Sequence, residues 1–128
     1  MRMEGLRDRT KQFALRVIRL YTALPKDTTG PVLGRQVLRS GTSVAANFRE
    51  ASRARSDAEF VAKLGTVEQE LDETMLWMEL LVESGMIKPE MLQPLHQETE
   101  ELLKIVVAAI KKTKAKQQSV EAGAKRRR

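Results

Sequence analysis

The chain has 128 residues, of which 41% are hydrophobic, and this is enough for one domain with a core of modest size. It has no cysteine, so a disulfide framework, a thiolate metal site and a cysteine nucleophile are all excluded. The net charge is +6, and residues 111–128 alone contribute +7, because they hold eight Lys or Arg against one Glu.

The hydrophobic residues are not arranged to enter a membrane. The longest uninterrupted apolar run, Ile105 to Ile110, is far shorter than the roughly 20 residues that a membrane-spanning helix needs. The first six residues lack the apolar segment of a secretory signal. We therefore expect a cytoplasmic protein with no membrane partner.

Two helices are predicted in the first half of the chain. Apolar residues recur at three- and four-residue steps from about Gly5 to Leu24, and Pro25 ends this helix because proline removes a backbone donor. Pro31 is placed at the first position of a second helix. One face of that helix carries Val37, Val44, Phe48 and Ala51.

Two further helices are predicted in the second half. Ser56 and Glu59 have the spacing of a capping box, which marks the start of a helix. The apolar stripe over residues 60–82 is the clearest helical pattern in the chain, and Gly85 is placed to end it in a left-handed cap. Pro89 then opens the fourth helix.

Four helices with short connections predict an all-α fold, an antiparallel up-down-up-down four-helix bundle over residues 1–118. Residues 119–128 follow as a flexible basic tail. The first, third and fourth helices are apolar on more than one stripe, whereas a single bundle buries one stripe per helix. We therefore expect a homo-oligomer that covers a second apolar face.

Small and polar residues occupy positions in the second helix where large aliphatic residues are usual. Another helix backbone is expected to come close there, and side-chain hydrogen bonds are expected to join the two helices. Glu70, Glu73 and Thr74 of the third helix are candidates to meet Arg39 or Arg49 across the bundle. The predicted helix-packing motif consists of Ser40, Gly41, Ser43, Ala45, Asn47, Glu70, Thr74 and Trp77.

The run over residues 36–47, with Leu24-Pro25 before it and Glu70 and Trp77 after it, resembles a bacterial four-helix-bundle family. This is the family of 23S rRNA intervening sequence proteins, related to the accessory variability determinants of diversity-generating retroelements. The resemblance extends over roughly residues 13–106. It implies a barrel-like homopentamer without an established enzymatic activity that binds nucleic acid, and its retroelement relatives work beside a reverse transcriptase.

Candidate groups for chemistry are few. His96 is the only histidine and has no second histidine or cysteine to complete a metal site. Ser40 and Ser43 have no histidine or lysine base at helical spacing that would activate a serine. Residues 30–35 lack the Lys-Ser or Lys-Thr ending of a phosphate-binding loop. We therefore expect no enzymatic activity, no metal and no cofactor.

The basic side chains favour nucleic acid as the partner. They are frequent in the first helix, where Arg7 and Lys11 lie, in the second helix and in the tail, and they would neutralise phosphates of RNA or DNA with little sequence preference. Aromatic residues are only 4% of the chain, which argues against base stacking. The candidate contacts are Arg16, Arg19, Arg35, Arg39, Arg49, Arg53, Lys111, Lys112, Lys114, Lys116, Lys125, Arg126, Arg127 and Arg128.

Two other interpretations of the same charge remain. The narrower one is an accessory factor to a reverse transcriptase, which depends on the neighbouring genes. The alternative is a protein-interaction scaffold whose basic surface docks an acidic partner protein.

Overall fold

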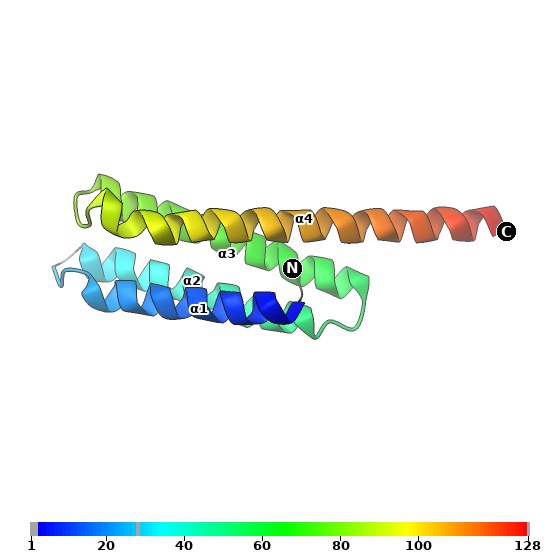
Figure 1. Cartoon of the computed structure of the whole chain (residues 1–128), viewed down its shortest axis with the longest axis horizontal. Coiled ribbons are helices and arrows are strands. Elements are labelled where there is room, and N and C mark those ends of the chain that lie inside the picture. The colour runs from blue at the N-terminus through cyan, green and yellow to red at the C-terminus, as the bar shows by residue number, and fades with distance from the viewer. Residues whose placement is uncertain (1–2, 28, 128) are drawn as a thin grey trace.

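The computed structural model describes residues 3–27 and 29–127, and these form four helices without a strand (Figure 1). The helices are α1 (Met3–Ala23), α2 (Gly30–Ser52), α3 (Asp57–Glu83) and α4 (Pro89–Arg127). Successive helices run in opposite directions and are joined by short turns. The predicted all-α four-helix bundle is confirmed. None of these helices is long and apolar enough to cross a membrane within the described residues.

The predicted signals at both ends of α3 are confirmed. The Ser56 hydroxyl accepts a hydrogen bond of 3.1 Å from the backbone N–H of Glu59, as in a capping box. The Glu59 carboxylate accepts its bond from the Arg55 N–H at 3.3 Å, one residue earlier than in the standard motif. At the other end, Gly85 has a φ of 81°, and the Met86 N–H donates to the Leu81 carbonyl at 3.0 Å. This is the Schellman arrangement that glycine favours.

The core lies between each helix and the helices that precede and follow it in the chain. Apolar stripes from all four helices meet there and exclude solvent. The largest side chains with almost no exposure are Phe13, Val17, Val37, Val44, Phe48, Leu64, Val67, Leu71, Met78, Leu81, Leu102 and Val106.

α1 and α2 come very close to each other at Gly41. A Cβ atom added to Gly41 would lie 2.7 Å from both γ-methyl carbons of Val17, closer than any relaxed contact. Val17 is fully buried and β-branched, so it has little freedom to move aside. The glycine is therefore required by the distance between the two helices.

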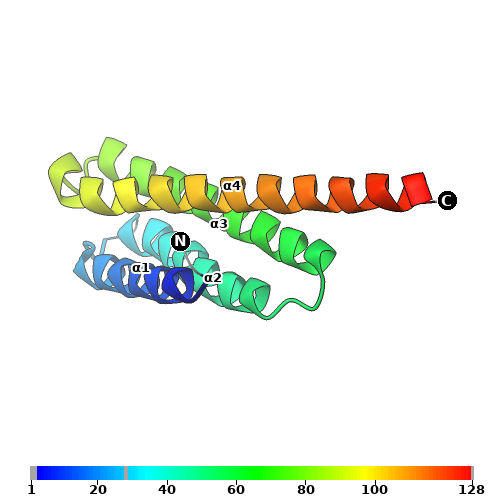
Figure 2. The same ribbon diagram turned by 45° about the vertical axis from the view of Figure 1, so that its right-hand side comes forward.

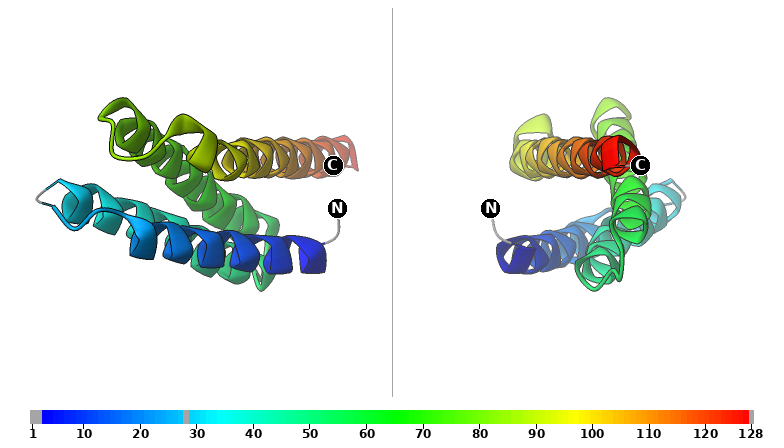
Figure 3. Two further views of the ribbon diagram at one scale, coloured as in Figure 1. Left: turned by 60° about the vertical axis from the view of Figure 1, so that its left-hand side comes forward. Right: turned by 90° about the vertical axis from the view of Figure 1, so that its right-hand side faces the viewer.

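The bundle is open along one seam. α1 packs on α2, α2 on α3 and α3 on α4, whereas α1 and α4 meet over only a small part of their length. Figures 2 and 3 show α3 crossing from the α1–α2 pair to α4. Arg9 of α1 bridges the seam with two bonds to the Glu98 carboxylate of α4, at 2.7 and 2.6 Å, and one to Glu101 at 2.7 Å. Hydrogen bonding to Glu98 raises the pKa of Arg9 above its ordinary value.

The structure differs from the predicted flexible tail over residues 119–128. Residues 119–127 continue α4 without a break, and only Arg128 lies outside the described part. Ala, Glu, Lys and Arg make up six of the nine residues 119–127, and they are strong helix formers whether or not an apolar face is buried. We call residues 111–127 the C-terminal arm; Figure 1 shows that it extends beyond the other three helices.

We expect Gly41→Ala to lower the free energy of unfolding by about 1–3 kcal/mol, because the new methyl group overpacks the contact with Val17. The matched control is Gly65→Ala on α3, where an added Cβ would have no neighbour within 4 Å. That substitution should instead stabilise the protein by about 0.5–1 kcal/mol. Urea unfolding followed by circular dichroism measures both, and equal effects at the two glycines would contradict the close approach of α1 and α2.

Candidate nucleic-acid interface

A groove with basic walls runs between α1 and α2 near the N-terminus of α1. It has a volume of about 500 Å³. α1 contributes Arg7 and Lys11, and α2 contributes Arg49 and Arg53. Small side chains line it between these cations because α2 has alanine at positions 45 and 46. We call this the α1/α2 groove.

The groove has an excess of positive charge. Its only lining carboxylate, Glu50, is also held by Lys63 of α3, with 3.6 Å between the amine nitrogen and the carboxylate oxygen. The four basic side chains make no ion pair with any part of the chain described by the structure. Four cations therefore face one carboxylate that is already partly neutralised, which is an arrangement suited to an anion with several charges.

The structure separates the predicted contact residues on α2. Arg49 and Arg53 lie together in the α1/α2 groove, and Arg35 is exposed elsewhere on the helix. Arg39 is differently placed, because its guanidinium lies 3.3 Å from the Glu70 carboxylate and 3.2 Å from that of Glu73 on α3. Arg39 joins two helices of the bundle and is a poor candidate for a phosphate contact.

Arg16 and Arg19 of α1 lie away from the α1/α2 groove. They flank an apolar groove of about 430 Å³ where α1 and α4 diverge. Its apolar lining comes from both helices and from the turn before α4, and Met91 in this lining is 69% exposed. We call it the α1/α4 groove; its lining also includes Leu20, Ala23, Ile87, Leu92, Pro94 and Leu95.

The remaining predicted contacts lie on the C-terminal arm. All of its described basic side chains are exposed. Lys116 also lies 3.4 Å from the Asp57 carboxylate at the start of α3, and this pair ties the base of the arm to the bundle. The residues concerned are Lys111, Lys112, Lys114, Lys116, Lys125, Arg126 and Arg127, while Arg128 is outside the described residues.

Part of the predicted helix-packing motif joins α2 to α3. Ser40 and Thr74 are both fully buried, and the Thr74 hydroxyl donates to Ser40 Oγ at 2.7 Å. The Asn47 amide instead donates within its own helix, to the Ser43 carbonyl at 2.9 Å. Ala45 is half-buried and lines the α1/α2 groove.

Two other members of the motif, Glu70 and Trp77, lie on α3. Glu70 pairs with Arg39 of α2, and no ion pair between described residues connects it with Arg49. Trp77 is half-buried against the core, and its indole nitrogen is buried without a hydrogen-bond partner among the described residues.

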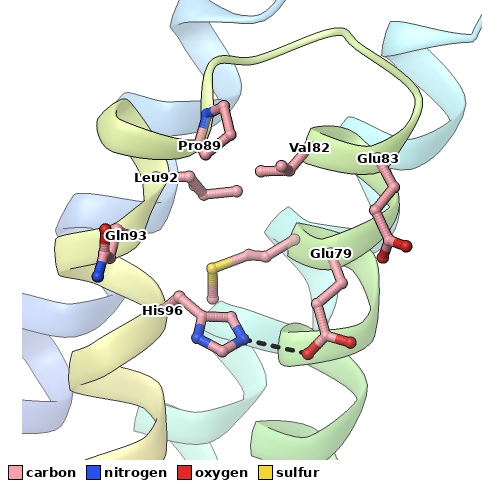
Figure 4. A pocket seen from close by; sticks show the side chains of 8 residues that line it. Glu79, Val82, Glu83, Pro89, Leu92, Gln93 and His96 are labelled. Atoms are coloured by element: carbon pink, nitrogen blue, oxygen red, sulfur yellow. Dashed lines mark hydrogen bonds and ion pairs between the residues drawn. The ribbon is translucent and has the colours of Figure 1, made fainter.

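His96 lies at an acidic cleft between α3 and α4 (Figure 4). Its Nε2 is 3.1 Å from the Glu79 carboxylate and its Nδ1 is 3.1 Å from that of Glu100. The cleft has a volume of about 220 Å³ and is mainly apolar below this rim. Carboxylates at the rim disfavour phosphate binding. Within residues 3–27 and 29–127, no cluster of His, Cys, Asp and Glu is arranged to hold a metal ion.

Arg7 and Lys11 are basic residues of the predicted first helix, but they are not among the predicted nucleic-acid contacts. Their four-residue spacing places them on one helical face, and this spacing is the feature of the sequence that could have indicated a shared binding surface. The charge count alone could not show which face of α1 lies beside Arg49 and Arg53, because that depends on how α1 packs on α2.

The fold and the groove together define a small helical-bundle protein with a cationic surface. Residues 6–108 match the 23S rRNA-intervening sequence protein family, and the chain belongs to this family. A crystal structure at 1.70 Å, of a protein with unknown function from the S23 ribosomal protein family of Bacteroides thetaiotaomicron VPI-5482, is similar. It is 36% identical, with a TM-score of 0.81, and the match covers 87% of this chain and 99% of that one. No curated protein matches the chain.

The different positions of Arg39 and Arg49 lead to opposite expectations. Arg39→Gln should lower the free energy of unfolding by up to about 1 kcal/mol, since it removes exposed ion pairs to α3, and should leave the affinity for a nucleic-acid probe nearly unchanged. Arg49→Gln should leave stability unchanged and weaken binding. Thermal unfolding and fluorescence anisotropy measure the two quantities, and equally weakened binding in both variants would show that the α1/α2 groove has no special role.

Proposed function

We propose that this protein is a non-enzymatic nucleic-acid-binding protein that contacts the phosphate backbone of RNA or DNA. The observation that carries the proposal is the α1/α2 groove, where Arg7, Lys11, Arg49 and Arg53 surround a floor of small side chains. Clustered Arg and Lys side chains neutralise phosphates and release counterions, which is a favourable and sequence-independent contribution to binding.

The side chains of the groove support contact with the backbone in preference to the bases. Alanine at positions 45 and 46 leaves room between the walls and offers no hydrogen-bonding group for a base edge. The five aromatic side chains of the chain are buried or half-buried, so none is an open platform for base stacking. Binding of this kind discriminates weakly between sequences.

The C-terminal arm and self-assembly would extend the same surface. The arm adds exposed cations beyond the bundle. Val32, Leu76 and Leu80 on α2 and α3 are 52%, 48% and 37% exposed, which supports a second apolar face that other copies cover. A homopentamer, which the family resemblance implies, would present about five copies of the groove at a raised effective concentration.

We propose that the protein binds nucleic acid in the cytoplasm. The family match to 23S rRNA-intervening sequence proteins supports RNA as the first nucleic acid to test. The resemblance to retroelement accessory proteins leads to a narrower proposal, in which the protein assists a reverse transcriptase.

A second candidate function is a protein-interaction scaffold that docks an acidic partner protein. The α1/α4 groove favours it, because two arginines, Arg16 and Arg19, flank a mainly apolar surface. An amphipathic helix with an acidic edge would match both its charge and its apolar floor. Loss of partner binding on Arg16→Glu and Arg19→Glu, with nucleic-acid binding retained, would identify this function.

The test of the proposed function is a fluorescence-anisotropy titration of unrelated RNA and DNA probes at several salt concentrations. The double variant Arg49→Glu, Arg53→Glu should weaken binding about tenfold or more at low salt. It should also lower the slope of log affinity against log salt by about 2, one for each phosphate that the variant no longer neutralises. The matched control, Lys26→Glu with Lys88→Glu, changes the net charge equally in the turns at the opposite end of the bundle.

Two results would contradict the proposal. Absence of binding by the intact protein at low salt would exclude nucleic acid as a partner. Equal weakening by the control variant would show that total charge, and not the α1/α2 groove, determines affinity.

We further expect Ala46→Leu to weaken binding severalfold without changing any charge. The residue is exposed on α2 and lines the groove, so a larger side chain occupies the space between the basic walls. Leucine is nearly as good a helix former as the alanine that it replaces. Thermal unfolding should show no loss of stability. Unchanged affinity would mean that the ligand contacts only the rim of the groove.

A further inference from the structure

The outer face of α3 has an apolar centre and acidic ends. Asp72, Leu76, Leu80 and Glu83 follow one another at steps of four, four and three residues, so they form a single stripe along the helix. All four side chains are exposed in the single chain. Two leucines one turn apart thus have a carboxylate at each end. We call these four residues the α3 ridge.

The leucines of the α3 ridge point away from the core of the bundle. Successive residues of an α-helix are rotated by about 100°, so Leu76 and Leu80 lie about 160° from the direction of the buried Met78. Covering two large apolar side chains is favourable. The carboxylates of Asp72 and Glu83 take part in no ion pair between residues that the structure describes. The surface that fits this ridge is therefore apolar with cations beside it.

The α1/α4 groove has this complementary chemistry. Its floor is apolar, and Arg16 and Arg19 flank it on α1. Neither arginine takes part in an ion pair within the part of the chain that the structure describes. On the α4 side, the apolar side chain of Met91 is exposed. A helix that presents leucines between carboxylates would bury its leucines on this floor and bring its carboxylates towards the two arginines.

The two surfaces lie near the same end of the molecule but on different sides of it. The α3 ridge is in the second half of α3, and the α1/α4 groove lies beside the last two turns of α1. Figure 1 shows that α1 and α3 finish at the same end of the bundle. The groove opens between α1 and α4, whereas α3 packs on α2 and α4. One copy can therefore use both surfaces at once, each with a different neighbour.

We propose that the α1/α4 groove of one copy receives the α3 ridge of the next copy. Such a head-to-tail contact joins two different surfaces, and it closes into a ring when the rotation between successive copies is a whole fraction of a full turn. It is therefore compatible with the homopentamer that the family resemblance implies. In a ring whose axis runs along the helices, contacting surfaces lie at the same level of every copy, and the ridge and the groove share one end of the bundle.

This inference rests on the self-assembly in the proposed function and names the surfaces that cover one another. It leaves the α1/α2 groove open to nucleic acid, because Arg7 and Arg16 are nine residues apart and so lie about 180° apart around α1. In the ring a neighbouring copy fills the α1/α4 groove, which is then closed to a separate acidic partner protein.

The test uses one variant of each surface, in the full-length chain and without nucleic acid. The groove variant is Arg16→Glu with Arg19→Glu, which places carboxylates opposite the acidic ends of the ridge. The ridge variant is Leu76→Gln with Leu80→Gln, which removes the apolar centre. Light scattering at high protein concentration should give the mass of a homopentamer for the intact protein and the 14.5 kDa of one chain for each variant.

Mixing the two variants identifies the contact as head-to-tail. The groove variant keeps an unaltered ridge and the ridge variant keeps an unaltered groove, so one native contact can form between them. We expect a 1:1 complex with twice the mass of one chain. The complex cannot grow further, because its two unoccupied surfaces are the altered ones.

Two controls keep either the apolar ridge or the change of charge. Leu76→Met with Leu80→Met retains an apolar ridge of similar volume and should assemble like the intact protein. Arg49→Glu with Arg53→Glu changes the charge equally in the α1/α2 groove, and should weaken nucleic-acid binding while the mass of the assembly stays unchanged. Circular dichroism confirms that each variant is folded. Arg19→Glu with Met91→Glu, at two exposed positions, replaces the groove variant if Arg16→Glu impairs folding.

A 1:1 complex from the mixture, with single chains from each variant alone, supports the proposal. The mass of the intact assembly in either surface variant overturns it, and so does a mixture that contains only single chains. A single chain for the intact protein overturns it as well. The anisotropy titration judges the proposed function separately, because loss of nucleic-acid binding by an assembled protein contradicts only that function.

Discussion

The contact between Gly41 and Val17 determines how near α1 comes to α2, and much of the surface chemistry depends on that distance. No other residue type fits at position 41 without moving the buried valine. The same close packing holds Arg7 and Lys11 of one helix beside Arg49 and Arg53 of the other. A contact that is entirely apolar thus positions four like charges, and the favourable packing opposes their mutual repulsion.

Apart from the C-terminal arm, the charges of the protein are divided between its two helix pairs. The α1–α2 pair has the groove with four cations, whereas α3 and α4 supply the carboxylates around His96. Arg39 with Glu70 and Glu73 spans the boundary between the pairs, and so does Arg9 with Glu98 and Glu101. Within the bundle, an anionic ligand is attracted to the α1/α2 groove and repelled from the carboxylates around His96, and the exposed cations of the C-terminal arm attract it as well.

Sequence reasoning worked well where the determining interactions are local. The capping box at Ser56, the left-handed cap at Gly85 and the apolar stripe of α3 depend on residues a few positions apart, and the structure has all three. Helix propensity is also local, yet the prediction of a flexible tail gave more weight to the fading apolar pattern than to the Ala, Glu, Lys and Arg content of residues 119–127. The helical arm shows that propensity prevailed there.

The candidate site was harder to predict because it depends on helix pairing. Arg39 and Arg49 are the same residue type on the same helix, and only the position of the α3 carboxylates distinguishes the structural arginine from the one in the groove. Gly41 and Ala45 are one turn apart and both small, but Gly41 meets the buried Val17 while Ala45 is half-buried beside Arg49. A single sequence carries no information on which of two small residues a neighbouring helix covers.

The open seam between α1 and α4 has a consequence for how the protein folds and opens. Since each helix packs mainly on the helix next to it in the chain, most contacts close short loops, and chains with such low contact order fold rapidly. The four helices behave as a linear array whose inner members, α2 and α3, each have two neighbours, whereas the outer members have one. Local unfolding therefore begins at α1 or α4, with the Arg9 bridge as the main restraint between them, and the α2–α3 pair is the last part to lose protection from hydrogen exchange.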